Sequence, residues 1–222
     1  ADVNYSQWDY QWLADQGNCV RIGLRQVFGL SRSRTELLLN SRADALFANT
    51  EQLRRGGLHE SDIQALAKAD ALTSLSGHRY QAQWDALSLS DQQMPLFNEV
   101  ADNKSEISIK PSETEDIKAD YASTGLSLRR HPMALIRNHP EVTKSITAET
   151  LAGCRSGQVI EVIGLVTCRQ RPGTKSGVTF LTLEDETGNI NVVVWAHTAR
   201  QFRQAYLTSK LLWVKGVVEI KS

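Results

Sequence analysis

The amino-acid sequence predicts an α+β chain in which an all-α N-terminal domain and a C-terminal β-barrel are joined by a linker. Toward the N-terminus, apolar residues recur at helical spacing between glycine-bearing turns. Acidic and polar residues of weak periodicity dominate the middle of the chain. Toward the C-terminus apolar and polar residues alternate, as in strands with one buried face. The expected parts are the end of a preceding region (1–19), the helical domain (20–85), an acidic linker (86–120), a connecting segment (121–150) and the barrel (151–222).

The helical domain contains two copies of one pattern, a helix, a glycine turn and a second helix. In the first copy Val27-Phe28-Gly29-Leu30-Ser31 leads to Ser33-Arg34-Thr35-Glu36, which fits a capping box with Ser33 at the helix start. In the second copy Thr50 is expected to cap a short helix that ends at Gly56-Gly57, and Leu58-His59 forms the next turn. The repeat is typical of tandem helix–hairpin–helix units.

Both turns predict contacts with phosphate. Backbone N–H groups at the start of the second helix lack helical partners, and the helix dipole favours an anion there. Residues 20–55 add seven arginines against three acids. The turns depart from the usual glycine–apolar–glycine form at Ser31 and at His59, and ordinary helical turns with solvated arginines are the alternative. The candidate phosphate contacts are Gly29, Leu30, Ser31, Arg32, Arg34, Gly56, Gly57 and His59.

One apolar segment, Gln93-Met94-Pro95-Leu96-Phe97, interrupts the acidic linker. It resembles the pentapeptide with which bacterial polymerases bind their sliding clamp. Leu96 and Phe97 would fill an apolar pocket on the partner, and Gln93 would form a hydrogen bond at its rim. The alternative is that Leu96 and Phe97 hold the linker against a neighbouring domain.

The C-terminal part predicts strands at about 158–169, 178–183 and 190–195, then a helix, then a strand from 211. This order resembles an oligonucleotide-binding (OB) barrel, whose expected fifth strand the sequence does not reach. The chain also opens without Met and stops in a strand pattern, so we expect it to be a fragment of a longer protein.

One face of this barrel is the candidate surface for nucleic acid. Alternation puts Leu181 and Leu183 in the core and Phe180 outside, where an aromatic ring can stack on a base. The hairpin at 169–177 carries basic residues and no acidic residue, and its basic side chains would contact phosphates. A register shift of one residue would exchange the faces, so a core position for Phe180 or Trp195 is the alternative. The candidate contacts are Arg169, Arg171, Lys175, Phe180, Trp195 and Lys215.

Composition narrows the function further. The chain holds 25 Lys+Arg and 25 Asp+Glu, so binding of a polyanion must depend on local patches. No apolar run approaches the length of a membrane span. We therefore expect no contact with a membrane, and we expect a cytoplasmic location. Cys19, Cys154 and Cys168 lie too far apart for a zinc site or a disulfide framework. His131 and His139 precede prolines without metal-ligand spacing, so no metal site is expected.

Taken together, these motifs resemble the C-terminal region of bacterial C-family DNA polymerases, the polymerase III alpha subunit type. The likeness is closer to the error-prone second alpha subunit of the SOS mutagenesis cassette. The residues that carry it are Val20 to Leu30, Asp70-Ala71-Leu72 with Gly77-His78-Arg79, Gly125 to Pro132, Arg169 to Gly173 and Thr182 to Gly188.

The resemblance implies a parent DNA-directed DNA polymerase, a nucleotidyltransferase that performs translesion synthesis in DNA repair and replication. Its catalytic carboxylates and Mg²⁺ would lie upstream, so no catalytic residue and no cofactor is expected in this chain. The hairpins would grip duplex DNA, the barrel would contact single-stranded template, and the clamp or other cassette proteins would be partners. In the error-prone branch a partner protein can supply clamp attachment instead. The alternatives are a tRNA- or single-strand-binding OB module of a synthetase or ligase, and a protein-interaction scaffold.

Overall fold

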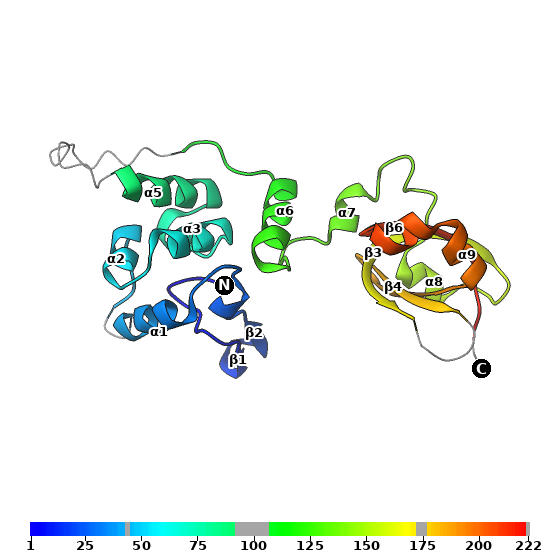
Figure 1. The fold of residues 1–222 in the computed structure, drawn as a ribbon, viewed down its shortest axis with the longest axis horizontal. Coiled ribbons are helices and arrows are strands. Elements are labelled where there is room, and N and C mark those ends of the chain that lie inside the picture. The colour runs from blue at the N-terminus through cyan, green and yellow to red at the C-terminus, as the bar shows by residue number, and fades with distance from the viewer. Residues whose placement is uncertain (43–44, 92–106, 172–176, 221–222) are drawn as a thin grey trace. The chain divides into compact units, whose positions relative to one another are not determined.

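The computed structural model describes residues 1–42, 45–91, 107–171 and 177–220, and it divides into two compact units, Ala1–Arg129 and Arg130–Ser222 (Figure 1). Helices dominate the first unit. Its elements are β1 (Gln11–Leu13), the 3₁₀ turn η1 (Ala14–Gln16), β2 (Cys19–Arg21), the 3₁₀ turn η2 (Leu24–Gln26), α1 (Arg32–Ser41), α2 (Thr50–Arg55), α3 (Glu60–Lys68), α4 (Thr73–Ser76), α5 (Arg79–Asp91) and α6 (Glu113–Thr124). The prediction of helices alone misses the small antiparallel pair β1–β2.

A single apolar core holds the first unit together. Ile63 and Leu66, one helical turn apart on α3, are almost fully buried together with Leu53 of α2. The N-terminal segment belongs to the same core, because Val3 is 0% exposed and its N–H donates to the carbonyl of Ala71 at 2.8 Å. Residues 1–19, expected to end a preceding region, therefore pack within this unit.

Two helices begin earlier than the sequence predicts. Helix α1 follows Ser31 rather than Ser33, and Glu36 forms an ion pair with Arg32 at 2.8 Å instead of closing a capping box. The cap of α2 is Asn49, whose side chain accepts the N–H of Gln52 at 3.0 Å. The expected boundaries are wrong by one or two residues, because several adjacent polar residues can each serve as a cap.

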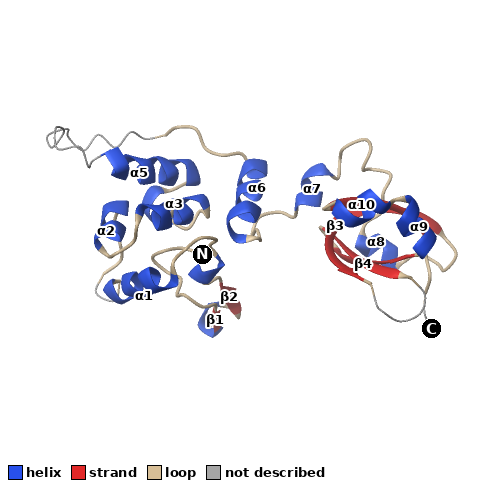
Figure 2. Ribbon diagram, in the orientation of Figure 1, coloured by secondary structure: helices blue, strands red, loops and turns tan. Residues whose placement is uncertain are grey.

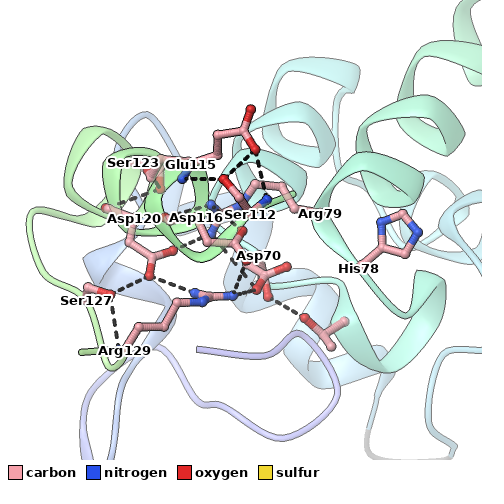
Figure 3. Close-up of polar contacts among 12 residues, drawn as sticks. Asp70, His78, Arg79, Ser112, Glu115, Asp116, Asp120, Ser123, Ser127 and Arg129 are labelled. Atoms are coloured by element: carbon pink, nitrogen blue, oxygen red, sulfur yellow. Dashed lines mark hydrogen bonds and ion pairs between the residues drawn. The ribbon is translucent and has the colours of Figure 1, made fainter. Parts of the chain in front are cut away.

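The acidic segment also differs from the expected linker, since it contains the end of α5 and most of α6. Its acids are not all solvated. Arg79, 2% exposed, forms ion pairs with Asp116 (3.0 Å) and Asp120 of α6. Arg129 forms ion pairs with the same two aspartates, and a third ion pair with Asp70 at 2.8 Å (Figure 3). Composition alone does not reveal that these charges are paired with one another. The clamp-like peptide Gln93 to Phe97 lies outside the described residues.

The second unit is a curled antiparallel sheet with short helices (Figure 2). The strands lie in the order β5-β4-β3-β6, which is that expected of an OB barrel without its last strand. Its elements are α7 (Pro132–Ile136), α8 (Ala148–Ala152), β3 (Val159–Gln170), β4 (Thr179–Asp185), β5 (Gly188–Val194), α9 (Ala196–Gln201), α10 (Arg203–Thr208) and β6 (Leu211–Val217).

Strand β3 curls the sheet by pairing with two strands along different halves of its length. Residues 159–165 pair with β6, and residues 165–170 pair with β4. Gly164 lies where the partners change. A Cβ there would be only 2.9 Å from the carbonyl oxygen of Glu184 and 3.0 Å from the Cβ of Leu183. The absence of a side chain at Gly164 therefore permits the close approach of β3 and β4.

The turn between β4 and β5 is held by the buried carboxylate of Asp185. It accepts the N–H groups of Thr187 (2.8 Å) and Gly188 (3.1 Å), and also that of Ala148 at the start of α8 (2.8 Å). Burial by itself would raise the pKa of Asp185, but these hydrogen bonds together lower it. Arg137 forms a bidentate pair with the neighbouring Glu186 at 2.6 and 2.9 Å. These contacts give the Thr182-to-Gly188 motif a structural role.

Candidate nucleic-acid interface

The outer face of β4 and β5 presents an aromatic ring to solvent. Phe180 is 46% exposed, whereas Leu181 and Leu183 on the opposite face are 3% and 0% exposed, as the alternation predicts. Phe180 lies beside Val193 of β5, itself 45% exposed, in the register of the two strands. An exposed ring in the middle of an OB sheet can stack on a nucleic-acid base.

Two further candidates occupy different surroundings. Trp195 is 53% exposed and lies just beyond β5, where it is the N-cap residue of α9. Lys215 on β6 is 3.3 Å from Glu161, so its charge already has a partner. The same Glu161 accepts the indole N–H of Trp213 at 3.2 Å. Trp195 therefore remains available to a ligand, and Lys215, whose side chain is 68% exposed, lies in a polar cluster with Glu161 of β3 and Trp213 of β6.

The basic residues of the hairpin between β3 and β4 have different surroundings. The guanidinium of Arg169 donates to the carbonyl oxygens of Tyr206, at 2.8 Å, and Ser209, which fastens α10 to the end of β3. Arg171 is exposed and lines a cavity with Arg200 and Arg203. Lys175 lies outside the described residues. Among the described basic residues of this hairpin, Arg171 thus lines a cavity.

In the first unit a buried aspartate occupies the place expected of a phosphate. Asp62, 0% exposed, accepts the N–H of Ser31 at 3.0 Å and the N–H of His59 at 3.1 Å. These are the same N–H groups of the two hairpin turns that sequence reasoning assigns to phosphate. Arg34 completes the site with a bidentate ion pair to Asp62 at 2.5 and 3.0 Å. Both hairpins therefore direct these donors to one internal carboxylate.

The environment of Asp62 also sets its charge. Burial alone would raise the pKa of this carboxyl group. The hydrogen bonds from Arg34, Ser31 and His59 stabilise the ionised form more strongly, and they hold the pKa below its usual value. The carboxylate is therefore charged at neutral pH, as a bound phosphate would be.

The turn residues themselves serve packing. Leu30 packs against the apolar core. A Cβ at Gly56 would lie 2.7 Å from the Cδ1 of Leu38, so helices α1 and α2 approach closely there. Gly29 and Gly57 form the two turns at positive φ, 79° and 101°. These features give the turn residues a structural role, and their expected contact with phosphate stays a prediction.

The arginines of residues 20–55 have protein partners. Their net surplus of four charges suggests a free basic surface, but each guanidinium is held by a carboxylate or by backbone carbonyl oxygens. The pairs are Arg21 with the carbonyl of Tyr5, Arg25 with Asp9, Arg32 with Glu36, Arg34 with Asp62, Arg42 with the carbonyls of Val3 and Ser6, and Arg54 and Arg55 with Glu51.

Two classes of site are absent from the part of the chain that the structure describes. No group of three or more His, Cys, Asp or Glu side chains there is placed to hold a metal ion. Over the same residues, no helix is both long and apolar enough to span a membrane.

Comparison with known proteins agrees with both halves of the fold. Residues 1–82 match the helix-hairpin-helix motif family, and residues 160–221 match the OB-fold nucleic acid binding domain family. The chain is 59% identical, over 99% of its length, to part of the error-prone DNA polymerase of Idiomarina loihiensis. It is similar to one segment of error-prone DNA polymerases. The corresponding enzymes of Vibrio campbellii and Alkalilimnicola ehrlichii are 45% and 41% identical over 90% and 99% of the chain.

These matches confirm the resemblance to error-prone DNA polymerases that the motifs indicate. They also confirm the predicted fold class, a helix–hairpin–helix region followed by an OB fold. The chain spans about a fifth of the length of these curated relatives, 22% of the Idiomarina protein and 19% of the Vibrio campbellii protein.

Sequence reasoning misses the residues that complete each site. It treats Asp62 as an ordinary helical acid, although its position three residues after His59 places it where an N-terminal cap acceptor belongs. It passes over Arg200 and Arg203 because they lie in a helical stretch away from the hairpin. One sequence signal could have found them, since residues 187–218 contain no Asp or Glu. Basic residues within a segment that contains no acidic residue lack local partners for ion pairs.

Proposed function

We propose that the OB unit binds single-stranded nucleic acid across the outer face of β4 and β5. The observation that supports this most directly is the exposed ring of Phe180 beside Val193 on the solvent side of the sheet. Base–aromatic stacking is tolerant of sequence, which suits a protein segment that must accept any template. Trp195 at the end of β5 extends the aromatic surface.

The charge distribution supports the same proposal. Residues 162–183 and 187–218 contain no acid, so Arg171, Arg200 and Arg203 lie in positively charged surroundings although the whole chain is neutral. Phosphate contacts of this kind give affinity that falls with salt. Since the basic groups are few, we expect a dissociation constant on the order of micromolar or weaker at physiological salt.

Fluorescence polarisation with a labelled oligo-dT strand tests the proposal on the 222-residue chain. Phe180→Ala should weaken binding by about 1–3 kcal/mol, the usual contribution of one stacked base. Trp12→Ala is the matched control, because Trp12 is 64% exposed but lies in the first unit. No binding of the parent chain at low salt would refute the proposal and favour a protein-interaction scaffold. Equal effects of the two substitutions would place the strand away from Phe180.

We further propose that the longer parent protein is an error-prone, DNA-directed DNA polymerase, as the names of the relatives suggest. In it the first unit would contact duplex phosphates through Arg32, Arg54 and Arg55, whose exposed ion pairs are weak enough to exchange for phosphate. Arg54→Gln with Arg55→Gln should then weaken duplex binding and leave single-strand binding unchanged. A clamp contact at 93–97 and Mg²⁺ in the parent enzyme remain proposals that rest on the resemblance.

A further inference from the structure

A cavity of about 380 Å³ in the OB unit is lined by Arg171, Gly177 and Thr179 and by residues of helices α9 and α10. Three arginines line it: Arg171 after β3, Arg200 in α9 and Arg203 at the start of α10. Ala196, Ala199 and Leu207 also line it. The lining thus combines three arginines with apolar side chains.

The positive charge of this cavity is not neutralised by the described protein. Among described residues, the ion pairs include no carboxylate partner for Arg171, Arg200 or Arg203, and Arg200 donates to the carbonyl of Ala196 at 3.2 Å. The undescribed residues 172–176, Pro-Gly-Thr-Lys-Ser, contain no acid either. Three like charges around one cavity repel one another, and an anion would relieve that repulsion. By contrast, five of the seven arginines of residues 20–55 form ion pairs with carboxylates.

The walls of the cavity are fixed by specific contacts. The hydroxyl of Tyr206 donates to the side-chain oxygen of Thr179 at 2.9 Å, which ties α10 to the start of β4. Arg169 holds the carbonyls at the end of α10, as described above. Gly177 packs so closely on α9 that a Cβ there would lie 3.1 Å from the Cβ of Ala196. Helices α9 and α10, which carry Arg200 and Arg203, are therefore held in place against the barrel.

The cavity and the stacking face lie on opposite sides of β4. Thr179, which lines it, is 2% exposed and points to the same side of β4 as the buried Leu181. Its neighbour Phe180 points to the opposite, solvent side. For one strand to use both surfaces, its backbone would have to pass over the end of β4, from the side of Phe180 to the side of Thr179.

We propose that Arg171, Arg200 and Arg203 form a phosphate-binding subsite for the backbone of the nucleic-acid strand. The planar guanidinium fork matches phosphate oxygens in two-point geometry, which favours phosphate over a simple halide ion. This inference rests on the proposed function, since it names a second contact of the same strand. It assigns Arg200 and Arg203 a role that neither the hairpin motif nor the stacking face includes.

The double substitution Arg200→Gln with Arg203→Gln tests the subsite in the full chain. Both side chains are exposed, so folding should be unaffected. For oligo-dT we expect about a tenfold loss of affinity at low salt. The slope of log K against log salt should also become shallower by about 0.7 for each phosphate that the variant no longer neutralises. Arg155→Gln, an exposed arginine of the same unit, is the matched control and should change both quantities little.

The outcomes separate this inference from the proposed function. Phe180→Ala should lower affinity and leave the salt slope unchanged. If Phe180→Ala weakens binding but Arg200→Gln with Arg203→Gln alters neither affinity nor slope, the subsite is refuted and the stacking face stands. If the chain binds no oligo-dT, calorimetric titration with inorganic pyrophosphate decides. Binding that the double variant abolishes retains the subsite, and absence of binding to the parent chain overturns it.

Discussion

Replacing Asp62 by Asn removes the charge that joins the two hairpin turns. The carboxylate is fully buried and accepts hydrogen bonds from Ser31, His59 and Arg34. Removing one partner of a buried ion pair costs about 3–5 kcal/mol. Arg34 is 32% exposed and can recover some hydration, and Asn keeps one acceptor oxygen. We therefore expect a loss at the lower end, about 3 kcal/mol of unfolding free energy for the first unit.

Calorimetry on the 222-residue chain measures this loss. The two units should give separate transitions, and the midpoint of the first should fall by about 10 °C, since 1 kcal/mol corresponds to about 3–4 °C for a unit of this size. Asp9→Asn is the matched control, because Asp9 pairs with Arg25 at 2.7 Å on the surface, where both side chains are more than half exposed. That change should cost under about 1 kcal/mol. Equal losses in the two variants would refute the assignment of Asp62 as the link between the hairpins.

The pH dependence gives a second test of the same residue. Because the folded-state pKa of Asp62 is lowered, its stabilising contribution is fully present above the unfolded pKa of about 3.9. The contribution is lost as pH falls through the lower, folded value. The difference in stability between the parent chain and Asp62→Asn should be constant near neutral pH and should shrink in acid. A difference that grows in acid would contradict the direction of the shift.

Three other substitutions test the structural account. Arg79→Met removes the buried partner of Asp116 and Asp120 but leaves them paired with Arg129, so it should cost about 3 kcal/mol, at the lower end of the range for a broken buried ion pair, measured as a lower midpoint of the first unit in urea unfolding. Gly164→Ala forces a Cβ to within 2.9 Å of the carbonyl oxygen of Glu184 and should cost about 1–3 kcal/mol, seen as a lower thermal midpoint of the second unit. Leu183→Ala empties a fully buried position of the barrel and should cost about 2–5 kcal/mol in the same assay. For each, a change below about 0.5 kcal/mol would contradict the packing or pairing described.

The barrel is predictable because its signal is local. Alternation along β4 assigns Leu181 and Leu183 to the core and Phe180 to the surface, and the structure agrees. The pairing of β3 with both β4 and β6 requires a close approach at Gly164, which a sequence marks only by the glycine itself. Period and turn chemistry therefore predict the fold, but not the place where the sheet bends.

The charged residues are less predictable because their partners are distant in sequence. Arg79 and Asp120 are separated by 41 positions, and Arg34 and Asp62 by 28. A count of charges over a segment assumes that each is solvated or acts locally. It therefore treats the acids of α6 as part of a linker and the arginines near the hairpins as free for DNA. Only the fold decides which charges neutralise one another.

Photo-crosslinking with an oligo-dT strand that carries 5-iododeoxyuridine tests the central claim most directly, because it reports which side chains touch the bases. The account predicts that the crosslinked peptides contain Phe180 and Trp195 on the OB unit. It also predicts that Phe180→Ala removes the crosslink at position 180 while the chain stays folded. Crosslinks confined to the exposed aromatic residues of the first unit, such as Trp12, would contradict it.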